Sequence, residues 1–356
     1  MKVGITGGYG FIGYHTYYNL KFTTDWDVVR LDKDFYNDER IKDCDWIIHL
    51  AGVNRGDEDE LYKQNIDLTQ LLLDSVKSGC NIVFSSSTHA ESNTTYGLCK
   101  SECEQMIQNW CQQYGGEFYN LRIPNVFGPF CKPNYNSFIT TMCHKVCNGE
   151  IVEITEDNDI NLIYVKDVVE QFKNCINNDK YEFNSTTISI RQILKKLQYY
   201  KNVYFNEAKI PNLNSDFDRN LFNTFISYLD NKDRLLPIEL HKDERGSLFE
   251  LLRTDSSEGQ IFFSTTNPNY IRGQHFHMRK FERFCVIKGN ARISMRKLGD
   301  DEVHNYYVDG DDIKVFDTPV MYTHNIENVG NEEMVAVFWV SKLLNKNDID
   351  TYWEDV

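Results

Sequence analysis

Two hydrophobic patterns divide the chain. In the first two-thirds, short apolar runs alternate with longer amphipathic stretches, such as 61–78 and 100–114, which predict helices. The short runs predict strands at residues 2–5, 27–31, 46–50, 81–84 and 117–121. Strands that alternate with helices of this length form βαβ units. This part of the sequence therefore predicts an α/β fold of the Rossmann type with a doubly wound parallel sheet.

The pattern changes near residue 235. From there the chain consists of short alternating runs, for example 284–287 and 334–340, separated by Gly, Asn and Asp. This pattern is typical of an antiparallel all-β barrel or jelly roll. We therefore expect two domains, one over residues 1–235 and an all-β one over residues 236–356.

Composition narrows the possible functions. The 356 residues include 38 Lys and Arg against 53 Asp and Glu, and the net charge of −15 argues against non-specific binding to nucleic acid or anionic membrane. No run of about 18 apolar residues occurs, so we expect no membrane span. The ten cysteines form no Cys-x-x-Cys pair, a usage typical of reduced thiols. The sequence thus indicates a soluble, cytoplasmic protein.

A glycine-rich turn, TGGYGFIG at residues 6–13, follows the first predicted strand and opens the first predicted helix. Glycines in this arrangement permit a tight turn, a close approach to a pyrophosphate and the packing of helix on strand, while the helix N-terminus favours an anion. The context predicts a dinucleotide site that includes Gly7, Gly10, Phe11, Ile12 and Gly13.

The end of the second predicted strand bears on the choice of cofactor. Asp32 would bind the free ribose hydroxyls of NAD, whereas Arg30 and Lys33 would favour the 2′-phosphate of NADP. Asp32 and Lys33 are therefore assigned to the cofactor site.

Tyr96 and Lys100 form a second constellation, because a spacing of four residues places both on one helix face. There the ammonium can lower the tyrosine pKa and bind a cofactor ribose, and the tyrosine can protonate an oxygen at a carbon that receives hydride. Ser87 ends the serine cluster just upstream and offers a hydroxyl to a substrate carbonyl. An incidental Tyr–Lys pair is the usual explanation in isolation, but the glycine turn favours a ketone-reducing site.

The all-β half contains a possible metal site. His275 and His277 alternate along one predicted strand and so project from the same face. Glu282 and His324, on neighbouring strands, could complete a site of three nitrogens and one oxygen. A lone histidine is more often structural, but four ligand-type residues at these spacings favour zinc or another divalent metal.

The first half resembles an extended short-chain dehydrogenase/reductase of the branch that acts on nucleotide-sugars. The likeness rests on the glycine turn, the HLAG turn at 49–52, Asn65, the serine cluster, the Tyr-x-x-x-Lys pair and the segment 122–129. It implies that the catalytic residues are Ser87, Tyr96 and Lys100. It also implies that Leu50, Ala51 and Gly52 contact the cofactor.

The same resemblance implies a sugar-nucleotide side lined by Arg122 and Asn125, with Lys132 and Asn134 close to the diphosphate. A structural salt bridge is the alternative for Arg122. Relatives of this kind favour NADPH, while Asp32 keeps NADH possible.

The second half resembles a cupin, although Met321 stands where the cupin pattern usually has glycine. The whole chain resembles the bifunctional capsule-sugar enzymes of the CapF type. This likeness implies a UDP-sugar substrate, with C3 of a UDP-4-keto-6-deoxy-hexosamine epimerised in the cupin and C4 then reduced. The product would be a UDP-2-acetamido-2,6-dideoxy-L-hexose, talose- or rhamnose-type, for polysaccharide biosynthesis. Cupins commonly pair through sheet edges, so we expect a homodimer.

The order of the two reactions follows from elementary chemistry, because the C3 proton is acidic only while C4 is a carbonyl. The base for epimerisation stays open among Tyr322, His304 and Lys288. Two alternative functions also stay open. The chain could be a 4-keto-sugar reductase whose cupin serves only stability or dimerisation, or a non-catalytic dinucleotide or sugar sensor.

Overall fold

The computed structural model describes residues 1–356 except 136, 231–233, 238–240, 244–245, 249–258 and 343–348. The chain divides into two compact units, which are described separately. The first consists of Met1–Phe138 and Asp157–Ile190, and the second of Ile139–Glu156 and Arg191–Val356.

A parallel five-stranded sheet forms the centre of the first unit. Its order is β2-β1-β3-β4-β5, where the strands are β1 (Lys2–Thr6), β2 (Asp27–Arg30), β3 (Trp46–His49), β4 (Asn81–Ser87) and β5 (Phe118–Ile123). Ile48 and Val83 pack in one core with Phe172 of a helix, whereas Ile47 packs with Leu72 in another core. Alternate residues therefore face opposite layers, which confirms the predicted doubly wound α/β fold.

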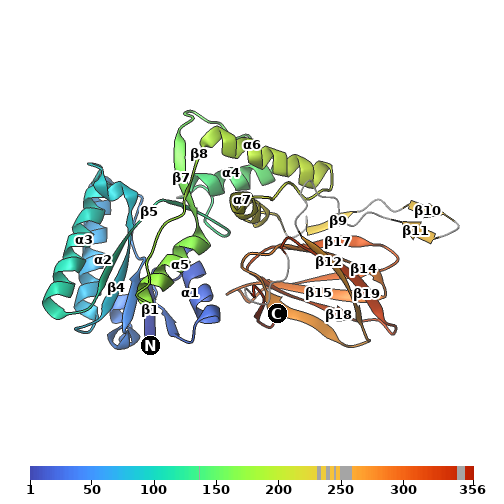
Figure 1. The fold of residues 1–356 in the computed structure, drawn as a ribbon, viewed down its shortest axis with the longest axis horizontal. Helices are drawn as coiled ribbons and strands as arrows, with labels where there is room; N and C mark the ends of the chain where they lie inside the picture. The colour runs from blue at the N-terminus through green and yellow to red at the C-terminus, as the bar shows by residue number, and fades with distance from the viewer. Residues whose placement is uncertain (136, 231–233, 238–240, 244–245, 249–258, 343–348) are drawn as a thin grey trace. The chain divides into compact units, whose positions relative to one another are not determined.

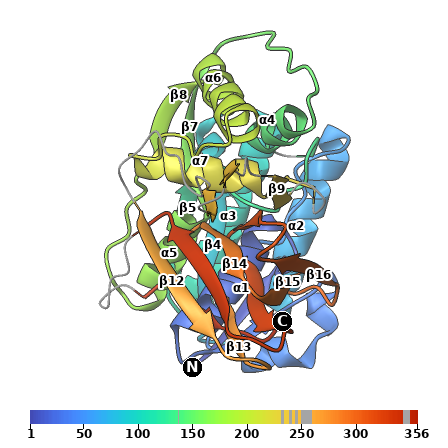
Figure 2. The ribbon, with the colours of Figure 1, turned by 90° about the vertical axis from the view of Figure 1, so that its right-hand side faces the viewer.

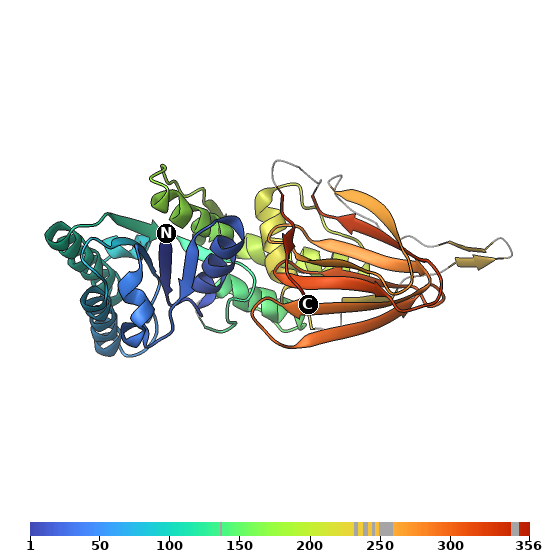
Figure 3. The same ribbon diagram turned by 90° about the horizontal axis from the view of Figure 1, so that it is seen from below.

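Helices cover both faces of this sheet (Figure 1, Figure 3). The helices are α1 (Phe11–Thr23), α2 (Glu58–Ser75), α3 (Thr95–Tyr114) and α5 (Val165–Ile176), with short turns η1 (Phe35–Asn37), η2 (Glu39–Asp43) and η3 (Thr88–Glu91). α2 and α3 begin earlier than predicted because of their caps. The Asp57 carboxylate accepts bonds from Asp59 and Glu60 N–H, and the Thr94 hydroxyl accepts one from Gly97 N–H. As a result, Tyr96 lies in the first turn of α3.

A small sheet completes the first unit. It consists of β6 (Asn125–Phe127), β7 (Asp159–Tyr164) and β8 (Thr186–Ser189), with β6 parallel and β8 antiparallel to β7.

Two antiparallel five-stranded sheets dominate the second unit, as Figure 2 shows in orange and red. One has the order β12-β19-β14-β17-β9, with β12 (Gln260–Thr266), β19 (Met334–Val340), β14 (Glu282–Lys288), β17 (Lys314–Thr318) and β9 (Leu235–Pro237). The other has the order β16-β15-β18-β13-β20, with β16 (Val303–Asp309), β15 (Asn290–Lys297), β18 (Tyr322–Asn328), β13 (Ile271–Phe276) and β20 (Tyr352–Trp353). In a separate two-stranded sheet, β10 (His241–Asp243) pairs antiparallel with β11 (Gly246–Leu248). The predicted antiparallel β architecture is confirmed.

Helices belong to this second unit as well. They are α4 (Phe138–Cys147), α6 (Ile190–Lys201), the π-helical turn η4 (Asn202–Asn206) and α7 (Asp216–Ile226). The first residues of α4 and α6, Phe138 and Ile190, still count with the first unit. Phe222 of α7 makes an edge-to-face contact with Phe281, at 5.8 Å between ring centroids. The helices α6 and α7 therefore group with the β-sheets, whereas the expected first domain, residues 1–235, includes them. An amphipathic pattern specifies that a helix buries one face but not which sheet it covers, so the pattern alone could not locate this boundary.

A fully buried ion pair lies under these helices. The Arg283 guanidinium donates two hydrogen bonds of 2.8 Å to the Asp317 carboxylate, and the Tyr204 hydroxyl of η4 also donates to that carboxylate. Arg283 and Asp317 are direct cross-strand partners on β14 and β17. The contact connects the helical segment to the sheet, and the two charges of the pair compensate each other away from water.

Replacing Arg283 tests how much this buried ion pair contributes to stability. In Arg283→Met the Asp317 carboxylate stays buried without its counter-ion, so we expect a loss of about 3–5 kcal/mol in the free energy of unfolding, measured by urea denaturation. Arg292→Met is the matched control, because Arg292 pairs with Glu327 on the same unit but its side chain is 40% exposed. The control should lose less than about 1 kcal/mol. Equal losses in both variants would contradict the role given to the buried pair.

Candidate functional site

The glycine turn between β1 and α1 is too crowded for side chains. A Cβ added at Gly13 would lie 2.2 Å from the Gly7 carbonyl oxygen, and one at Gly7 would lie 2.8 Å from Ala51 N. Gly7 also has a φ of +63°, in the left-handed region that glycine tolerates. Gly10 is the N-cap residue of α1 and, as a glycine, offers no side chain to cap the helix. The turn thus leaves the first N–H groups of α1 without a side-chain acceptor, which suits a pyrophosphate.

A buried hydrogen-bond group joins this turn to the end of β3. The Thr6 hydroxyl accepts bonds from the N–H groups of Leu50 and Ala51, both at 3.2 Å, and lies 2.7 Å from His49 Nδ1. Burial, together with the positive charge of Lys100, lowers the pKa of His49 to about 3, so the ring is neutral. The Thr6 oxygen already accepts from two N–H groups, so the Thr6 hydroxyl donates a hydrogen bond to His49 Nδ1. The predicted cofactor segments at 6–13 and 50–52 are therefore held side by side.

Asn65 fixes the next part of this loop. Its amide donates to the carbonyl oxygens of Val53 (2.7 Å) and Leu61 (2.8 Å), and its oxygen accepts from Val53 N–H at 3.0 Å. A Cβ at Gly52 would lie 2.9 Å from the same Asn65 oxygen and 3.8 Å from Lys100 Nζ. Gly52 is thus placed beside the Tyr96–Lys100 pair.

The structure places Tyr96 and Lys100 on one face of α3, beside the end of β4. The Lys100 ammonium is buried, donates to the Ser85 carbonyl at 3.0 Å and lies 5.9 Å from the centroid of the Tyr96 ring. The expected lowering of the tyrosine pKa is wrong for this structure. Burial dominates and raises the pKa of Tyr96 to about 12, while burial also lowers the pKa of Lys100. Tyr96 is therefore protonated at neutral pH and can act as a proton donor.

Ser87 and Tyr96 are connected by a tightly packed turn that the sequence analysis missed. The Ser87 hydroxyl accepts a bond of 3.2 Å from His89 N–H and so caps η3. A Cβ at Gly97 would lie 2.3 Å from the His89 carbonyl oxygen. Only a glycine after Tyr96 allows η3 to pack this closely on α3. The Tyr-Gly dipeptide within the Tyr-x-x-x-Lys pair was the available signal.

The predicted substrate side gives a mixed result. Arg122 binds two carboxylates, Glu104 at 2.8 and 3.1 Å and Glu91 at 2.7 Å, so its observed contacts are those of a structural salt bridge. Asn125 donates to the Asn161 carbonyl at 3.4 Å. A role of Arg122 in binding substrate stays a prediction, as it does for Asn125.

Lys132 and Asn134 lie close to aromatic and basic neighbours. Lys132 Nζ is 5.5 Å from the centroid of the Tyr135 ring, and the Asn134 carbonyl accepts a bond of 3.1 Å from Arg55. The Arg55 guanidinium lies 5.3 Å from the same Tyr135 ring. Positive charge therefore gathers around Tyr135, as a diphosphate would require.

Asp32 and Lys33 are exposed at the end of β2, where the Asp32 carboxylate accepts a bond of 2.7 Å from Lys33 N–H. The Arg30 guanidinium lies against the glycine turn, 4.0 Å from the centroid of the Tyr9 ring, and donates to the Gly8 carbonyl at 3.1 Å. Of these three residues, Arg30 is the one that contacts the turn.

The four predicted metal ligands converge in the second unit. One ligand atom from each of His275, His277, Glu282 and His324 lies within 4.8 Å of the others. Glu282 lies between two imidazoles, with Oε2 at 2.9 Å from His324 Nε2 and Oε1 at 3.2 Å from His277 Nε2. Three of the four side chains are buried, and His275 pairs directly with His324 across β13 and β18.

These residues fit a divalent metal. His277 Nε2 is buried and has no hydrogen-bond partner of acceptable geometry, so it presents a nitrogen that a cation would satisfy. Burial and the two neighbouring imidazoles lower the pKa of His275 to about 3, which keeps it in the neutral, coordinating form. Burial opposes ionisation of Glu282, but the adjacent His277 and His324 lower its carboxyl pKa well below the ordinary value. Three nitrogens and one carboxylate form a donor set typical of zinc.

Met321, the departure from the cupin pattern, keeps the geometry of the glycine that it replaces. Its φ is +65°, and its N–H donates a bond of 2.8 Å to the His277 carbonyl oxygen. The loop that leads to His324 is therefore formed despite the substitution.

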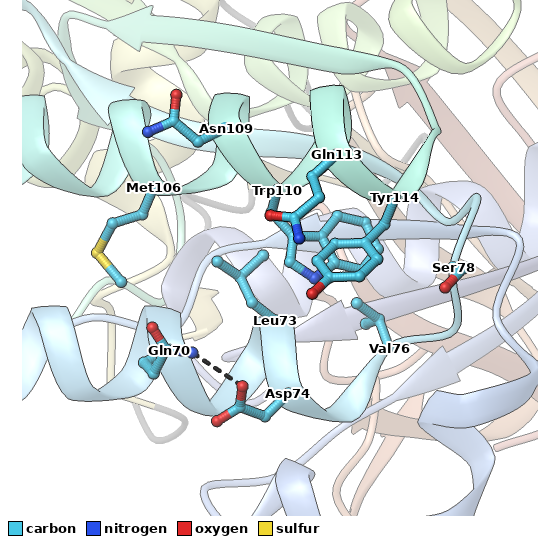
Figure 4. Close-up of a pocket in the computed structure, with 10 residues that line it drawn as sticks. All are labelled: Gln70, Leu73, Asp74, Val76, Ser78, Met106, Asn109, Trp110, Gln113 and Tyr114. Carbon is cyan, nitrogen blue, oxygen red and sulfur yellow. Dashed lines mark hydrogen bonds between the residues drawn. The ribbon is translucent and has the colours of Figure 1, made fainter.

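A surface pocket on the first unit belongs to neither site. Figure 4 shows it between α2 and α3, where Leu73, Trp110 and Tyr114 are among its lining residues. Gln70 and Asp74, joined by a hydrogen bond of 2.8 Å, lie at its margin. In the part of the chain that the structure describes, no helix combines the length and the apolar character needed to cross a membrane.

Comparisons with known proteins agree with this geometry. The model of the NAD dependent epimerase/dehydratase family matches residues 3–185, and that of the polysaccharide biosynthesis C-terminal domain matches residues 241–352. A protein of Pseudomonas aeruginosa named UDP-2-acetamido-2,6-beta-L-arabino-hexul-4-ose reductase is 32% identical, over 99% of this chain and 98% of its own length.

Solved structures give the same relationship over the whole chain. The capsular polysaccharide assembling protein CapF from Staphylococcus aureus is 33% identical with a TM-score of 0.64, and it covers 100% of both chains. CapF with the inhibitor 3-isopropenyl-tropolone is 32% identical, again over 100% of both chains, with a TM-score of 0.59. These matches confirm the resemblance inferred from the motifs and support a nicotinamide cofactor. The chain belongs to the NAD dependent epimerase/dehydratase family and, like CapF, joins that domain to a second, β-rich one.

Proposed function

We propose that this chain is a bifunctional enzyme that epimerises C3 of a UDP-4-keto-6-deoxy-hexosamine in its β-rich unit and reduces C4 in its α/β unit. The observation that carries the proposal is the convergence of His275, His277, Glu282 and His324 in a chain that also has the Tyr96–Lys100 pair. The Pseudomonas relative is named as a reductase of a UDP-linked 4-keto sugar, which supports this substrate class.

The reduction uses three side chains of the first unit. When bound, the nicotinamide supplies a hydride to C4. Tyr96, protonated at neutral pH, gives its hydroxyl proton to the C4 oxygen, and the Ser87 hydroxyl donates a hydrogen bond to the same oxygen. Lys100, held by the Ser85 carbonyl, binds the cofactor ribose.

The epimerisation depends on the acidity of the C3 proton while C4 is a ketone. The cluster of three histidines and Glu282 would hold a divalent metal, which supplies positive charge against the negative charge of the enolate. Of the three candidate bases, Lys288 is too distant, because it is six residues from Glu282 along β14, or about 20 Å. His304 and His324 are the cross-strand partners of Met295 on its two sides, so His304 lies two strands away from the ligand His324. His304 and Tyr322 both stay candidates for the base.

We further propose NADPH as the cofactor. Arg30 lies beside the glycine turn and, with Lys33, would attract the 2′-phosphate, while the exposed Asp32 keeps NADH as the alternative. Asn125, Lys132 and Asn134 would contact the sugar-nucleotide, with Lys132 and Arg55 providing charge for its diphosphate.

The predicted homodimer is also a proposal. β12 ends its sheet, and Ile261 and Phe263 on this strand are 61% and 71% exposed. Apolar side chains on an edge strand favour pairing with another chain.

Replacing the tyrosine tests the reductase. Tyr96→Phe removes the proton donor but not the ring, so ketone reduction should fall by about 10²–10⁴-fold, measured as NADPH oxidation with the UDP-4-keto sugar. NADPH binding, followed by fluorescence, should be unchanged. Tyr114→Phe is the matched control, since Tyr114 lies at the exposed end of the same helix. A Tyr96→Phe enzyme that keeps more than a tenth of the wild-type rate would refute the assigned role.

Replacing the histidines tests the epimerase. In a Tyr96→Phe background, which blocks reduction, the C3 position should exchange with deuterium in D₂O, as followed by NMR. His275→Ala and His324→Ala should each lower the metal content and abolish this exchange, because each removes one of four ligands. His144→Ala, on α4 of the same unit, should change neither quantity.

Two outcomes would overturn the epimerase assignment. Full metal occupancy in both variants would show that the ligands are misassigned. Absence of exchange in the metal-loaded Tyr96→Phe protein would leave a reductase whose β-rich unit serves only stability or dimerisation.

A further inference from the structure

A buried aspartate close to the C-terminus binds the loop that carries two of the metal ligands. Asp350 is 1% exposed. Its Oδ1 accepts a bond of 3.1 Å from Met278 N–H, and its Oδ2 accepts bonds of 2.9 Å from the N–H groups of Arg279 and Lys280. Three successive backbone N–H groups thus converge on one carboxylate, an arrangement that fixes the path of a loop strongly.

This loop runs from His277 to Glu282, so its path sets the separation of two ligands. Arg279 Nε lies 3.5 Å from Asp350 Oδ1 and partly balances the buried negative charge. The carboxylate therefore has both hydrogen-bond donors and a counter-ion. Nothing in the two proposed reactions uses it directly.

The main chain of Asp350 acts on His277 itself. The Asp350 carbonyl oxygen is bonded to His277 Nδ1, and Thr351 Oγ1 lies 3.5 Å from the same nitrogen. A carbonyl oxygen only accepts, so Nδ1 carries a proton and the opposite nitrogen, Nε2, is the one that can coordinate. Nε2 is also the atom that lies 3.2 Å from Glu282 Oε1.

The residues that follow hold the other histidine of the strand. β20 pairs with the end of β13, placing Trp353 opposite His275 and Tyr352 opposite Phe276. The Tyr352 and Phe276 rings stack, with their centroids 5.4 Å apart. The segment 350–353 therefore supports both histidines of the His-x-His pair from outside the cluster.

We propose that Asp350 is a positioning residue of the metal site, which orients His277 through its carbonyl and sets the distance from His277 to Glu282 through its carboxylate. The inference rests on the proposed metal site. Groups that orient metal ligands in this way typically change affinity by about 10–100-fold when they are lost.

Zinc affinity, rather than activity, tests this role. The full-length protein is stripped of metal, and Zn²⁺ binding is measured by competition with a chromophoric chelator. Asp350→Ala should bind Zn²⁺ about 10–100-fold more weakly than wild type, because the loop loses its anchor. Asp350→Asn keeps one acceptor oxygen, so its Zn²⁺ affinity should lie between those of wild type and Asp350→Ala. If the alanine variant does not fold, Asp350→Asn provides the test instead.

Arg296→Ala is the matched control. Arg296 fastens the same C-terminal segment, through the Glu354 side chain and the Asp355 carbonyl, but it contacts none of the four ligands. Its Zn²⁺ affinity should stay within about threefold of wild type. An Asp350→Ala protein that binds Zn²⁺ as tightly as wild type would overturn the inference. An equal loss of Zn²⁺ affinity in Arg296→Ala would also overturn it, because any loosening of the C-terminal segment would then weaken the site.

The same titration separates this inference from the proposed function. If wild type and His275→Ala bind Zn²⁺ equally weakly, the proposed metal site is refuted, and the role of Asp350 is refuted with it. If wild type binds Zn²⁺ tightly and Asp350→Ala does so equally, only the positioning role is refuted. Far-UV circular dichroism of each metal-free variant confirms that it is folded.

Discussion

Both sites depend on one constraint, that a polar group withdrawn from water must find a partner inside the protein. In the first unit the Thr6 hydroxyl meets this need for Leu50 N–H, Ala51 N–H and His49 Nδ1 together, and so joins two segments that are predicted to bind the cofactor. Asn65 does the same for both polar groups of Val53. These bonds hold the two loops beside the predicted cofactor site, although His49 Nε2 is buried without a hydrogen-bond partner.

In the second unit the same constraint acts on charges. Arg283 and Asp317 compensate each other and hold the helical segment through Tyr204, while Asp350 is compensated by three N–H groups. Glu282 differs, because its neighbours are imidazoles, each of which has a second nitrogen committed elsewhere, as that of His277 is to the Asp350 carbonyl. Burial alone would lower the pKa of His277, but the Glu282 carboxylate raises it above the usual value. In the proposed metal site a cation would take the place of the proton that this pair holds.

The sequence predicted the features that depend on neighbours in the chain. The glycine turn, the Tyr96–Lys100 spacing and the His-x-His pair could be found because their function is encoded within a few residues. Glu104 and Asp350 were missed because their partners are remote, with Asp350 bonded to N–H groups 70 and 72 residues away. The effect of burial on the Tyr96 pKa was missed for a similar reason, since desolvation depends on everything packed around the ring. A hydrophobic pattern likewise could not tell which sheet α7 covers.

The two proposed reactions compete for one ketone. Tyr96 holds its proton at neutral pH, so the proposed reduction does not depend on a prior protonation of the tyrosine, although its raised pKa makes it a weaker acid. Reduction removes the carbonyl that makes the C3 proton acidic, so any ketone that reaches the first unit too early is lost to epimerisation. Under the proposed function, the α/β unit must therefore discriminate by the configuration at C3. That discrimination requires contacts to the sugar rather than to the reacting oxygen, so it would depend on the residues proposed to bind the sugar-nucleotide and not on Tyr96.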